Sequence, residues 1–595
     1  MKIFNLTVLL FLIFQSSFGQ KYELGKVTLE ELKQKTHPTD SSATACVLFK
    51  KGKSFFELNS EGYFNLVTEV EKKIKIYKKE GYDYAAEAIP YYTGGKQVRV
   101  VFQDAATYNL VGDKIEKTRL KSDGEFTEAV NEDYSIKKIA LPNVKEGSVI
   151  EYRYIIKTPY YTAFPDFYFQ HSIPVNYVEY AVKIPQYFVY KKFMKGFAAI
   201  SASSETVEKN TMRGYNESKI IYSGKDIKAL KSESYVNNID NYTSIIQYEL
   251  ASTNFPASGI ENYATDWESV AKTIYNNKDF GDELNNKSYF EKDLAIVLKD
   301  VVSQEEKIKT IFNFVKSRMN WNEKYGYYCQ SGVKKAYSEK VGNVAEINLM
   351  LTGMLRYAGI QANPVLVSTR SNGIAIYPNR TAYNYVIAAV EIDNNTQLLL
   401  DATSKNALPD ILPLRDLNWV GRMIREDKTS KEINLMPKIN SREVINVMAK
   451  IDNDGKITGK ARDQYFDYNA FLFRDYYLAM AKESYIESIE KRYAGIEIGE
   501  YATTNDKDLL KPLIENFDFT HKNLVENIGN KLYFSPMLYY AREENPFKDE
   551  EREYPVDFPF PYQDKFSFNI TIPDGYEIES MPKPLALAMD QNLGT

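Results

Sequence analysis

The spacing of hydrophobic and polar positions changes twice along the chain. Up to about residue 236, and again after about residue 437, short runs rich in β-branched and aromatic residues are separated by turn residues. Residues 149–156 and 178–184 are the clearest of these runs. Between them, from about residue 260, hydrophobic residues recur at spacings of three and four, as on one face of a helix. The pattern therefore predicts two β-rich regions around a region that contains helices.

Helix starts in the middle region are marked by two capping boxes, in which a hydroxyl residue is followed three positions later by Glu. The first pairs Thr265 with Glu268, and we expect its helix to run to about residue 275. The second pairs Ser303 with Glu306. It opens a predicted helix with one hydrophobic stripe, formed by Ile308, Ile311, Phe312, Val315 and Met319.

A third helix is predicted over residues 344–357, because Gly359 stands where helices commonly end. Two strands should follow, over residues 384–392 and 397–400. In the middle region the predicted helices therefore precede the predicted strands.

The last region should begin with a hairpin of residues 444–451 and 456–461. Its turn, at residues 452–455, resembles a calcium loop, but Lys450 and Ala461 would then hold the first and twelfth ligand positions. A hairpin turn is the better interpretation. A helical stretch over residues 468–493 and a strand over 566–572 follow. No closing strand is evident after them, so we expect this domain to be cut short.

The fold class predicted from these patterns is α+β multidomain. A signal peptide (residues 1–19) should precede a β-sandwich-like N-terminal domain (20–250), a central domain (260–425) and a β-rich C-terminal domain (437–595). A chain of 595 residues is too long for one hydrophobic core, which agrees with several domains.

The first residues have the features of an export signal. Lys2 precedes an apolar run from Leu6 to Phe14, and small residues at Ser17 and Gly19 suit a signal peptidase. The run is too short to cross a membrane, and no later apolar stretch is long enough. We therefore expect export to the periplasm or the cell exterior, a mature chain that begins near Gln20, and no membrane span in that chain.

Charge and scarce residue types exclude several function classes. The formal net charge is -5 and no long basic run occurs, which argues against nucleic acid as a partner. The only cysteines are Cys46 and Cys329, so this is not a disulfide scaffold, although the two could pair. The three histidines, His37, His171 and His521, are too far apart in sequence for a zinc site, and we expect neither a metal nor a cofactor.

Aromatic residues are concentrated in residues 159–169. A platform on which sugar rings stack is one interpretation. Packing in the core or along a sheet edge is the more common use of such rings.

Three sequence motifs carry a resemblance to a known family. Residues 342–346 read Gly-Asn-Val-Ala-Glu, and residues 354–362 read Met-Leu-Arg-Tyr-Ala-Gly-Ile-Gln-Ala. Further on, Ala382-Tyr383-Asn384 precedes a strand and Asp401-Ala402-Thr403 follows one. In order and spacing, residues 265–405 resemble the transglutaminase-like superfamily of papain-fold proteins. The flanking regions are similar to uncharacterised domains that accompany it in exported proteins of gram-negative bacteria.

The resemblance implies a catalytic triad whose first two members are replaced here. Val344 occupies the place of the family's cysteine and Asn384 that of its histidine, while Asp401 matches the aspartate. The family's acyl transfer needs a thiolate at a helix N-terminus and an imidazole that moves the proton. Valine has no nucleophile, and an amide cannot accept and return a proton near neutral pH.

The remaining polar residues have two interpretations. Asp401 could only stabilise a turn through Thr403, or it could form a retained polar cleft with Asn384 and the candidate residue Glu346. A relocated nucleophile is a further possibility, since Cys329 lies fifteen residues before Val344. However, no His occurs between His171 and His521 to serve as its base.

The favoured hypothesis is a non-catalytic protein that binds a peptide, a peptidoglycan fragment or a glycan, or that scaffolds envelope proteins. The first alternative is an active transglutaminase-like acyltransferase or cysteine protease with a relocated nucleophile. The second is a purely structural exported protein without a ligand.

Overall fold

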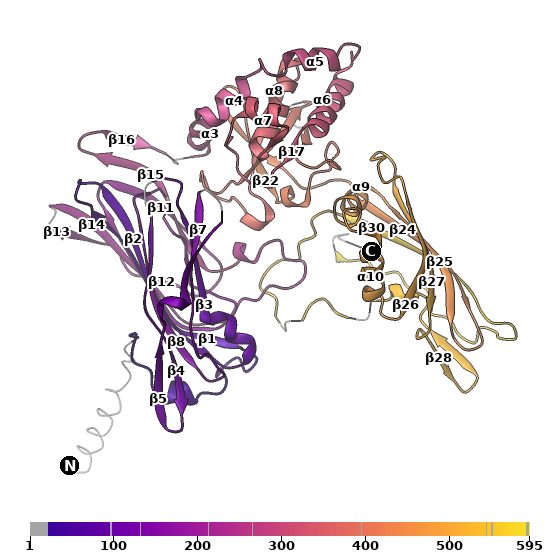
Figure 1. Cartoon of the computed structure of the whole chain (residues 1–595), viewed down its shortest axis with the longest axis horizontal. Coiled ribbons are helices and arrows are strands. Elements are labelled where there is room, and N and C mark those ends of the chain that lie inside the picture. Colours follow the sequence, from indigo (N-terminus) through magenta and orange to yellow (C-terminus); the bar gives the residue numbers. More distant parts are fainter. Residues whose placement is uncertain are drawn as a thin grey trace. The chain divides into compact units, whose positions relative to one another are not determined.

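The computed structural model describes residues 22–590 and 594, except 96–97, 131–132, 163, 212–213, 264–265, 394–395, 543 and 549–550. The predicted signal peptide and Thr265 of the first capping box lie outside these residues. The chain forms two compact units. Unit 1 comprises the residues up to 273 with 376–380 and 552–555, and unit 2 comprises 274–375, 381–551 and the residues from 556 onward (Figure 1).

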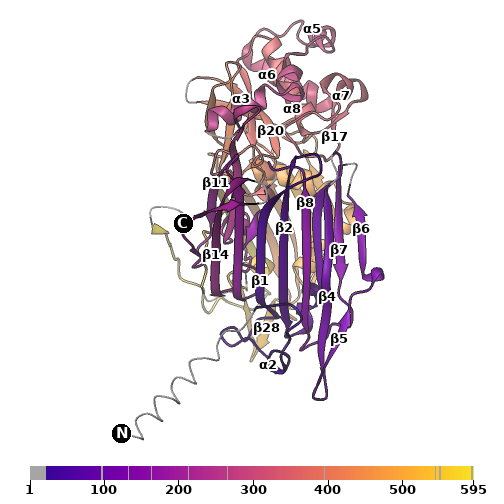
Figure 2. The same ribbon diagram turned by 90° about the vertical axis from the view of Figure 1, so that its left-hand side faces the viewer.

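Unit 1 is built around a large sheet. Nine of its described strands join in the order β12-β14-β10-β1-β2-β8-β4-β5, with β13 also paired to β14. Most neighbours are antiparallel, but β1 and β10 run parallel. Figure 2 shows the long strands β1, β2, β8 and β4 side by side. The strands are β1 (Ala45–Leu58), β2 (Phe64–Ile76), β4 (Arg99–Val111), β5 (Lys114–Arg119), β8 (Val149–Thr158), β10 (Val175–Pro185), β12 (Ser201–Ala202), β13 (Thr206–Asn210) and β14 (Tyr215–Ile227).

Two smaller sheets complete unit 1. One contains β9 (Phe167–Tyr168), β11 (Phe188–Lys195), β15 (Ile245–Phe255) and β16 (Gly259–Asn262), and the other contains β3 (Ala86–Tyr92), β6 (Glu125–Ala129) and β7 (Tyr134–Ala140). One hydrophobic core joins residues of all three sheets, for example Tyr180, Tyr248 and Ile139. This confirms the sandwich-like prediction. Short helical segments are α2 (Leu29–Lys33), η1 (Lys79–Ala85), η2 (Ser122–Gly124) and η3 (Ile239–Asn241).

The aromatic segment at residues 159–169 belongs to this core. Phe164, Phe167 and Phe169 are buried, and the Phe167 ring stacks on Tyr180 with 4.1 Å between centroids. These rings therefore pack the interior, as the commoner use of such residues suggested.

In the middle of the chain, helices come first and strands second, as predicted. The helical part contains α3 (Trp267–Tyr275), η4 (Lys278–Asp282), α4 (Glu283–Asn285), α5 (Glu291–Val297), α6 (Gln304–Arg318), α7 (Val333–Glu339) and α8 (Val344–Tyr357), with the short strands β17 (Asn320–Trp321) and β18 (Val341–Gly342) between them. The α8 boundaries match the prediction, and Gly359 follows with a positive φ of 78°. In α6, Ser303 caps the backbone of Glu306, and the predicted hydrophobic stripe is buried.

Five described strands of this region form an antiparallel sheet in the order β21-β20-β19-β22-β23. They are β19 (Ala362–Val367), β20 (Tyr385–Glu391), β21 (Gln397–Leu400), β22 (Val420–Ile424) and β23 (Ser430–Asn434), with η5 (Arg370–Asn372) and η6 (Leu414–Asp416) in the connections. Helix α8 packs against β19 and β20 and is buried on nearly every side. The sheet and α8 therefore form the core that positions the expected site.

The C-terminal region forms a second five-stranded sheet in the order β26-β27-β25-β24-β30, in which β30 runs parallel to β24. Its strands are β24 (Ser441–Ile451), β25 (Ile457–Tyr465), β26 (Ile496–Thr504), β27 (Leu513–His521) and β30 (Tyr562–Thr571). A hairpin of β28 (Val525–Ile528) and β29 (Lys531–Phe534) and the turn η8 (Leu538–Tyr540) complete it. Asp452 Oδ1 accepts hydrogen bonds from the backbone of Asp454 and Lys456, so the calcium-like segment is a hairpin turn.

The single helical stretch predicted over residues 468–493 is divided into three parts. These are α9 (Asp467–Leu472), a π-helical turn η7 (Phe473–Tyr477) and α10 (Lys482–Arg492), and Ala481 is extended before α10. The break at Ala481 lets Phe473 and Tyr485 lie in one core cluster, which a continuous α-helix would separate. Figure 1 shows α9 and α10 on one face of the sheet.

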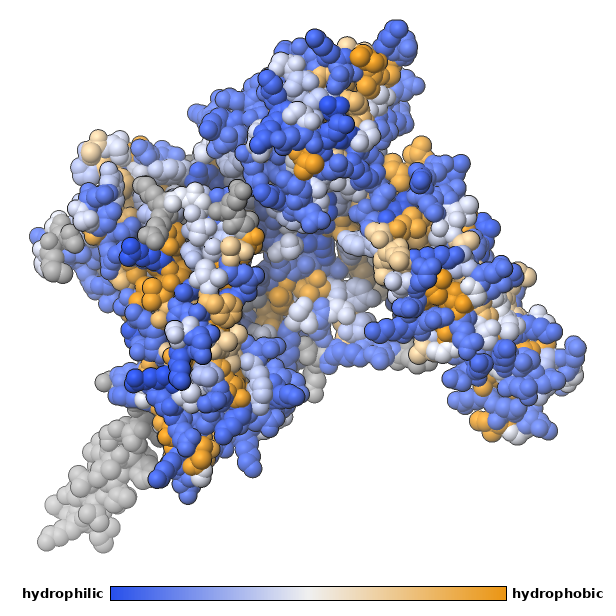
Figure 3. Space-filling view, in the orientation of Figure 1, coloured by the Kyte–Doolittle hydropathy of each residue, from blue (hydrophilic) through white to orange (hydrophobic). Residues whose placement is uncertain are grey.

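No helix within the described part of the chain is long and apolar enough to cross a membrane. The face seen in Figure 3 is mostly hydrophilic, and its hydrophobic residues form separate patches.

Candidate functional site

The start of α8 is fixed by a reciprocal cap. Asn343 Oδ1 accepts a hydrogen bond from the backbone N–H of Glu346, and Glu346 Oε2 accepts one from the N–H of Asn343. Val344 is the first residue of the helix and is fully buried. The position that the resemblance assigns to a nucleophile therefore carries a hydrocarbon side chain at a well-formed helix N-terminus.

The carboxylate of Glu346 also holds the segment before α7. Its Oε1 accepts hydrogen bonds from the backbone N–H groups of Gln330, Ser331 and Gly332, at 3.0, 2.5 and 3.1 Å. Together with the bond from Asn343, four backbone donors stabilise one buried charge. Glu346 is therefore committed to positioning the chain around α8.

Asp401 directly follows β21 and is completely buried. Its Oδ1 accepts hydrogen bonds from Asn348 Nδ2 at 2.8 Å and Thr403 N at 2.9 Å. Its Oδ2 accepts them from Tyr385 OH and Thr403 Oγ1, both at 2.9 Å. The Arg415 guanidinium lies 3.7 Å from Oδ2. Four neutral donors stabilise the carboxylate and Arg415 offsets its charge, and these contacts tie β20, β21 and α8 together.

Asn384 directly precedes β20 and makes a two-point contact with Thr369. Its Oδ1 accepts a hydrogen bond from Thr369 N, and its Nδ2 donates one to Thr369 Oγ1, both at 2.9 Å. The two hydrogen bonds of this amide therefore hold the loop after β19 against the start of β20.

One loop joins the two positions at which the family's cysteine and histidine are expected. Val344 N donates to Lys324 O at 3.3 Å, and Gly326 N donates to Asn384 O at 2.8 Å. Among the described residues, no hydrogen bond links Asn384 to Asp401 or to Glu346. The structure thus places these residues around one end of α8, but each side chain bonds to a different part of the chain.

Neither cysteine is a reactive thiol in this structure. Both are buried and free, and the hypothetical bond between them is not formed. Burial raises the pKa of Cys329, and the nearby Glu283, Glu346 and Asp279 raise it further. Burial likewise raises the pKa of Cys46 to about 12. Because the thiolate is the nucleophile, both shifts disfavour the reactive form of these thiols.

Sequence reasoning missed the partners of Asp401. Asn348 bridges α8 to the sheet, because it donates to Asp401 and to Val386 O and accepts from Ala402 N. The neighbouring Asp416 is fully buried, and its burial and the charge of Asp401 raise its pKa well above the usual range. Asn348 lies four residues after Val344, on the same face of α8. This spacing could have identified Asn348 from the sequence.

The comparisons with known proteins agree with this architecture. The sequence profile of the transglutaminase-like superfamily matches residues 295–402. The middle of the chain is a transglutaminase-like domain. The profiles of two domains of unknown function with solved structures match on either side, DUF3857 at residues 65–218 and DUF3858 at 530–594. The α+β multidomain prediction, with a transglutaminase-like domain at its centre, is confirmed.

Several solved structures are similar to this chain at low sequence identity. A candidate protease from Parabacteroides distasonis is 12% identical, with a TM-score of 0.49, over 83% of this chain and 95% of that one. A candidate cysteine protease from Cytophaga hutchinsonii is 12% identical, with a TM-score of 0.17, over 45% of this chain and 90% of that one. A search of curated protein sequences returns no match.

Proposed function

We propose that the transglutaminase-like domain is non-catalytic and that the chain is an exported binding or scaffolding protein of the cell envelope. One observation carries this proposal. The polar groups at the expected catalytic positions are used by the fold itself, since Asp401 is saturated by donors and Asn384 pairs with Thr369. Triad chemistry needs a nucleophile and a base that are free to exchange a proton.

The relocated-nucleophile alternative has less support. Cys329 is the only thiol of this domain, and its protonated, buried state does not suit attack on a carbonyl. Its backbone N–H donates to Asp279 O, which holds it in the segment before α7. We therefore assign Cys329 a packing role.

An amine-incorporation assay and a peptidase assay on wild type, Cys329→Ala and the matched control Cys46→Ala test this proposal. We expect no turnover above background from any of the three. Robust wild-type turnover that disappears only in Cys329→Ala would make Cys329 the nucleophile. Turnover that survives both substitutions would also overturn the proposal, because the chain would then be a different kind of enzyme.

Restoring the missing groups gives a complementary test. Val344→Cys alone should remain inactive, since no base faces the new thiol. Val344→Cys with Asn384→His, keeping Asp401, supplies both groups. Trace activity in the double variant only would support a lost catalytic triad at these positions.

The export part of the proposal depends on the first residues. N-terminal sequencing of protein from its native host should give a chain that begins near Gln20. Recovery of intact Met1 in the cytosol would contradict it. For the ligand, a peptide, a peptidoglycan fragment or a glycan remain our candidates.

A further inference from the structure

Three acidic residues occupy one inward-facing side of the C-terminal sheet. Glu443 lies on β24, Asp463 on β25 and Glu515 on β27, and strand alternation places them on the same face as Ile445 and Phe517. Asp463 and Glu515 stand directly opposite each other in the strand register. Burial and the charge of Glu515 raise the pKa of Asp463 well above its usual range, and burial raises the pKa of Glu515. Without a cation these facing acids therefore favour their protonated forms, and a positive group is needed to hold both as carboxylates.

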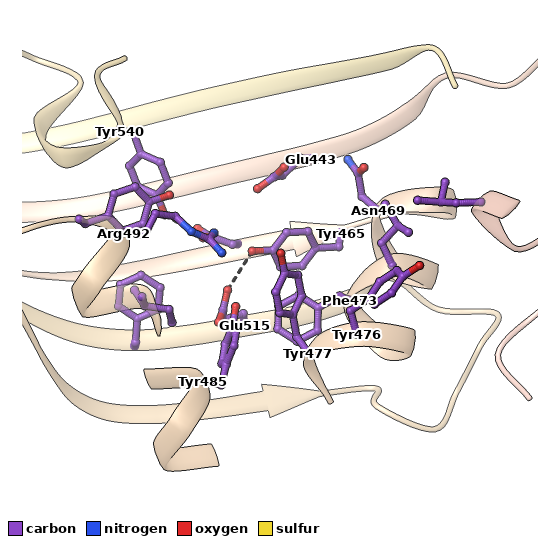
Figure 4. Close-up of a pocket in the computed structure, with 16 residues that line it drawn as sticks. Glu443, Tyr465, Asn469, Phe473, Tyr476, Tyr477, Tyr485, Arg492, Glu515 and Tyr540 are labelled. Carbon is purple, nitrogen blue, oxygen red and sulfur yellow. Dashed lines mark hydrogen bonds between the residues drawn. The ribbon is translucent and has the colours of Figure 1, made fainter. Parts of the chain in front are cut away.

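The three carboxyl groups line a pocket of about 400 Å³ between this face and the helical segments η7 and α10. In Figure 4, the side chains of Glu443, Glu515 and Arg492 point toward one another across it. Aromatic rings form much of the remaining wall, including Tyr465, Tyr476, Tyr477, Tyr485, Tyr493 and Tyr540. The size suits a small organic molecule.

The hydrogen bonds inside the pocket leave an acceptor unused. Tyr465 OH donates to Glu515 Oε2, and Tyr540 OH donates to Asp463 Oδ2, both at 2.8 Å. Asp463 is 3% exposed, and its Oδ1 has no hydrogen-bond partner among the described residues. A buried carboxyl oxygen at a cavity wall is costly without a hydrogen-bond partner. A ligand in the cavity that carries a donor would supply that partner.

The charge in the pocket is also incomplete. Arg492 is the only cation among the lining residues, against three carboxyl groups. No group of three His, Cys, Asp or Glu within the described ranges is arranged to hold a metal ion. The volume of the pocket and its aromatic walls favour a cation with an organic body that contacts the rings. Ammonium groups bind well where carboxylates and aromatic faces meet.

We propose that this pocket binds an organic ammonium ion, a primary amine carried on an aromatic or apolar group. The ammonium would donate to Asp463 and Glu515, and the apolar group would pack between the tyrosine rings. This inference does not depend on whether the transglutaminase-like domain is catalytic, because the pocket uses residues of the C-terminal region and Leu414.

Three compounds of one shape test the charge requirement on the full chain. Benzylamine, benzyl alcohol and benzoate share a ring and differ in charge, and calorimetric titration at about pH 8 measures their binding. We expect benzylamine to bind at least about tenfold more tightly than benzyl alcohol, and benzoate not to bind. Equal binding of all three, preferred binding of benzoate at Arg492, or no binding of benzylamine would overturn the proposal.

Substitutions then locate the binding site. Asp463→Asn should weaken benzylamine binding by about tenfold or more, while the unliganded protein stays folded, because repulsion with Glu515 is relieved. Glu515→Gln gives an independent second variant. Glu483→Gln, an exposed position at the start of α10, is the matched control and should bind as wild type. Wild-type affinity in both pocket variants would refute the assignment.

The pH dependence of binding adds a further readout. Burial, with the charges of Asp564 and Glu515, raises the pKa of Glu443 to about 7, against the opposing effect of Arg492 and Arg542. Burial also raises the pKa of Asp463, well above its usual range, and the pKa of Glu515. A bound cation favours the ionised form of all three acids, so binding should release protons. Benzylamine affinity should therefore increase from about pH 6 to about pH 8, and an affinity that falls over this range would contradict the proposed contacts.

Discussion

Two buried aspartates of unit 2 each have an acidic neighbour but differ in what offsets their burial. Asp401, next to Asp416, accepts four hydrogen bonds and lies beside Arg415, whereas Asp463, opposite Glu515, accepts one hydrogen bond from Tyr540. The first carboxylate holds elements of the fold together. Burying the Asp463 carboxyl group costs free energy that its single hydrogen bond does not offset. A retained family residue can thus be purely structural, while a residue outside any motif is the better candidate for binding.

The largest expected effect tests the structural role of Asp401. Asp401→Ala should lower the free energy of unfolding by about 3–5 kcal/mol, because it removes the carboxylate that Tyr385 OH and Asn348 Nδ2 donate to and leaves the half-buried Arg415 without its paired charge. Scanning calorimetry can measure the loss, with Asp300→Ala as an exposed control in the same domain. A loss below about 1 kcal/mol would show that the network does not stabilise the domain.

The next effect concerns the cap of α8. Glu346→Gln should cost about 2 kcal/mol, since the amide cannot accept from both Asn343 N and the three N–H groups of residues 330–332. Urea unfolding of this variant should be compared with that of Glu339→Gln, an exposed control on the neighbouring helix α7. Equal stability of the two variants would mean that the segment before α7 is held by other contacts.

The pH dependence of the free energy of unfolding tests the acidic pocket through Glu443. Because burial raises the pKa of Glu443 from 4.5 to about 7, the folded state keeps a proton that the unfolded state releases. Stability contributed by this group is therefore lost as pH rises, by about 1 kcal/mol between pH 6 and pH 8. Melting temperatures of wild type and Glu443→Gln across this range measure it, and parallel curves would refute it.

The smallest effect has the opposite sign from those of Asp401 and Glu346. Asp463→Asn should raise the free energy of unfolding by about 0.5–1 kcal/mol in the absence of ligand. Burial and the facing Glu515 raise the pKa of Asp463 well above its usual range, so folding requires a proton at this position that asparagine does not need. Calorimetry without any added amine is the measurement. A destabilised variant would indicate that Asp463, like Asp401, serves the fold.

Local signals in the sequence were sufficient to predict helix α8 and strand β21. The helix begins at a polar cap and ends before Gly359, and both are short-range features. The acidic pocket could not be predicted in the same way. Acidic residues are usually exposed, and only the pairing of β25 with β27 brings Asp463 beside Glu515, which lies 52 positions later in the chain. One local signal was available. Leu513, Phe517 and Phe519 alternate along β27 on the same face as Glu515, which indicates that Glu515 faces the core.

The same limit applies to the middle domain. The motif spacing correctly placed Val344 at a helix start and Asp401 after a strand. It could not reveal that Asn348, Tyr385 and Arg415 would saturate Asp401, because these side chains come from three separate elements. Such convergence depends on how the helix packs on the sheet.

The parallel pairing of β24 with β30 has a consequence for biosynthesis. Ser441 is paired with Tyr562, so one side of β24 stays without its partner strand until more than a hundred further residues have left the ribosome. During that interval the nascent chain presents an open strand edge, on which another chain could pair. Slow emergence of β30, rather than weak packing of the finished sheet, would then limit the yield of correctly assembled molecules.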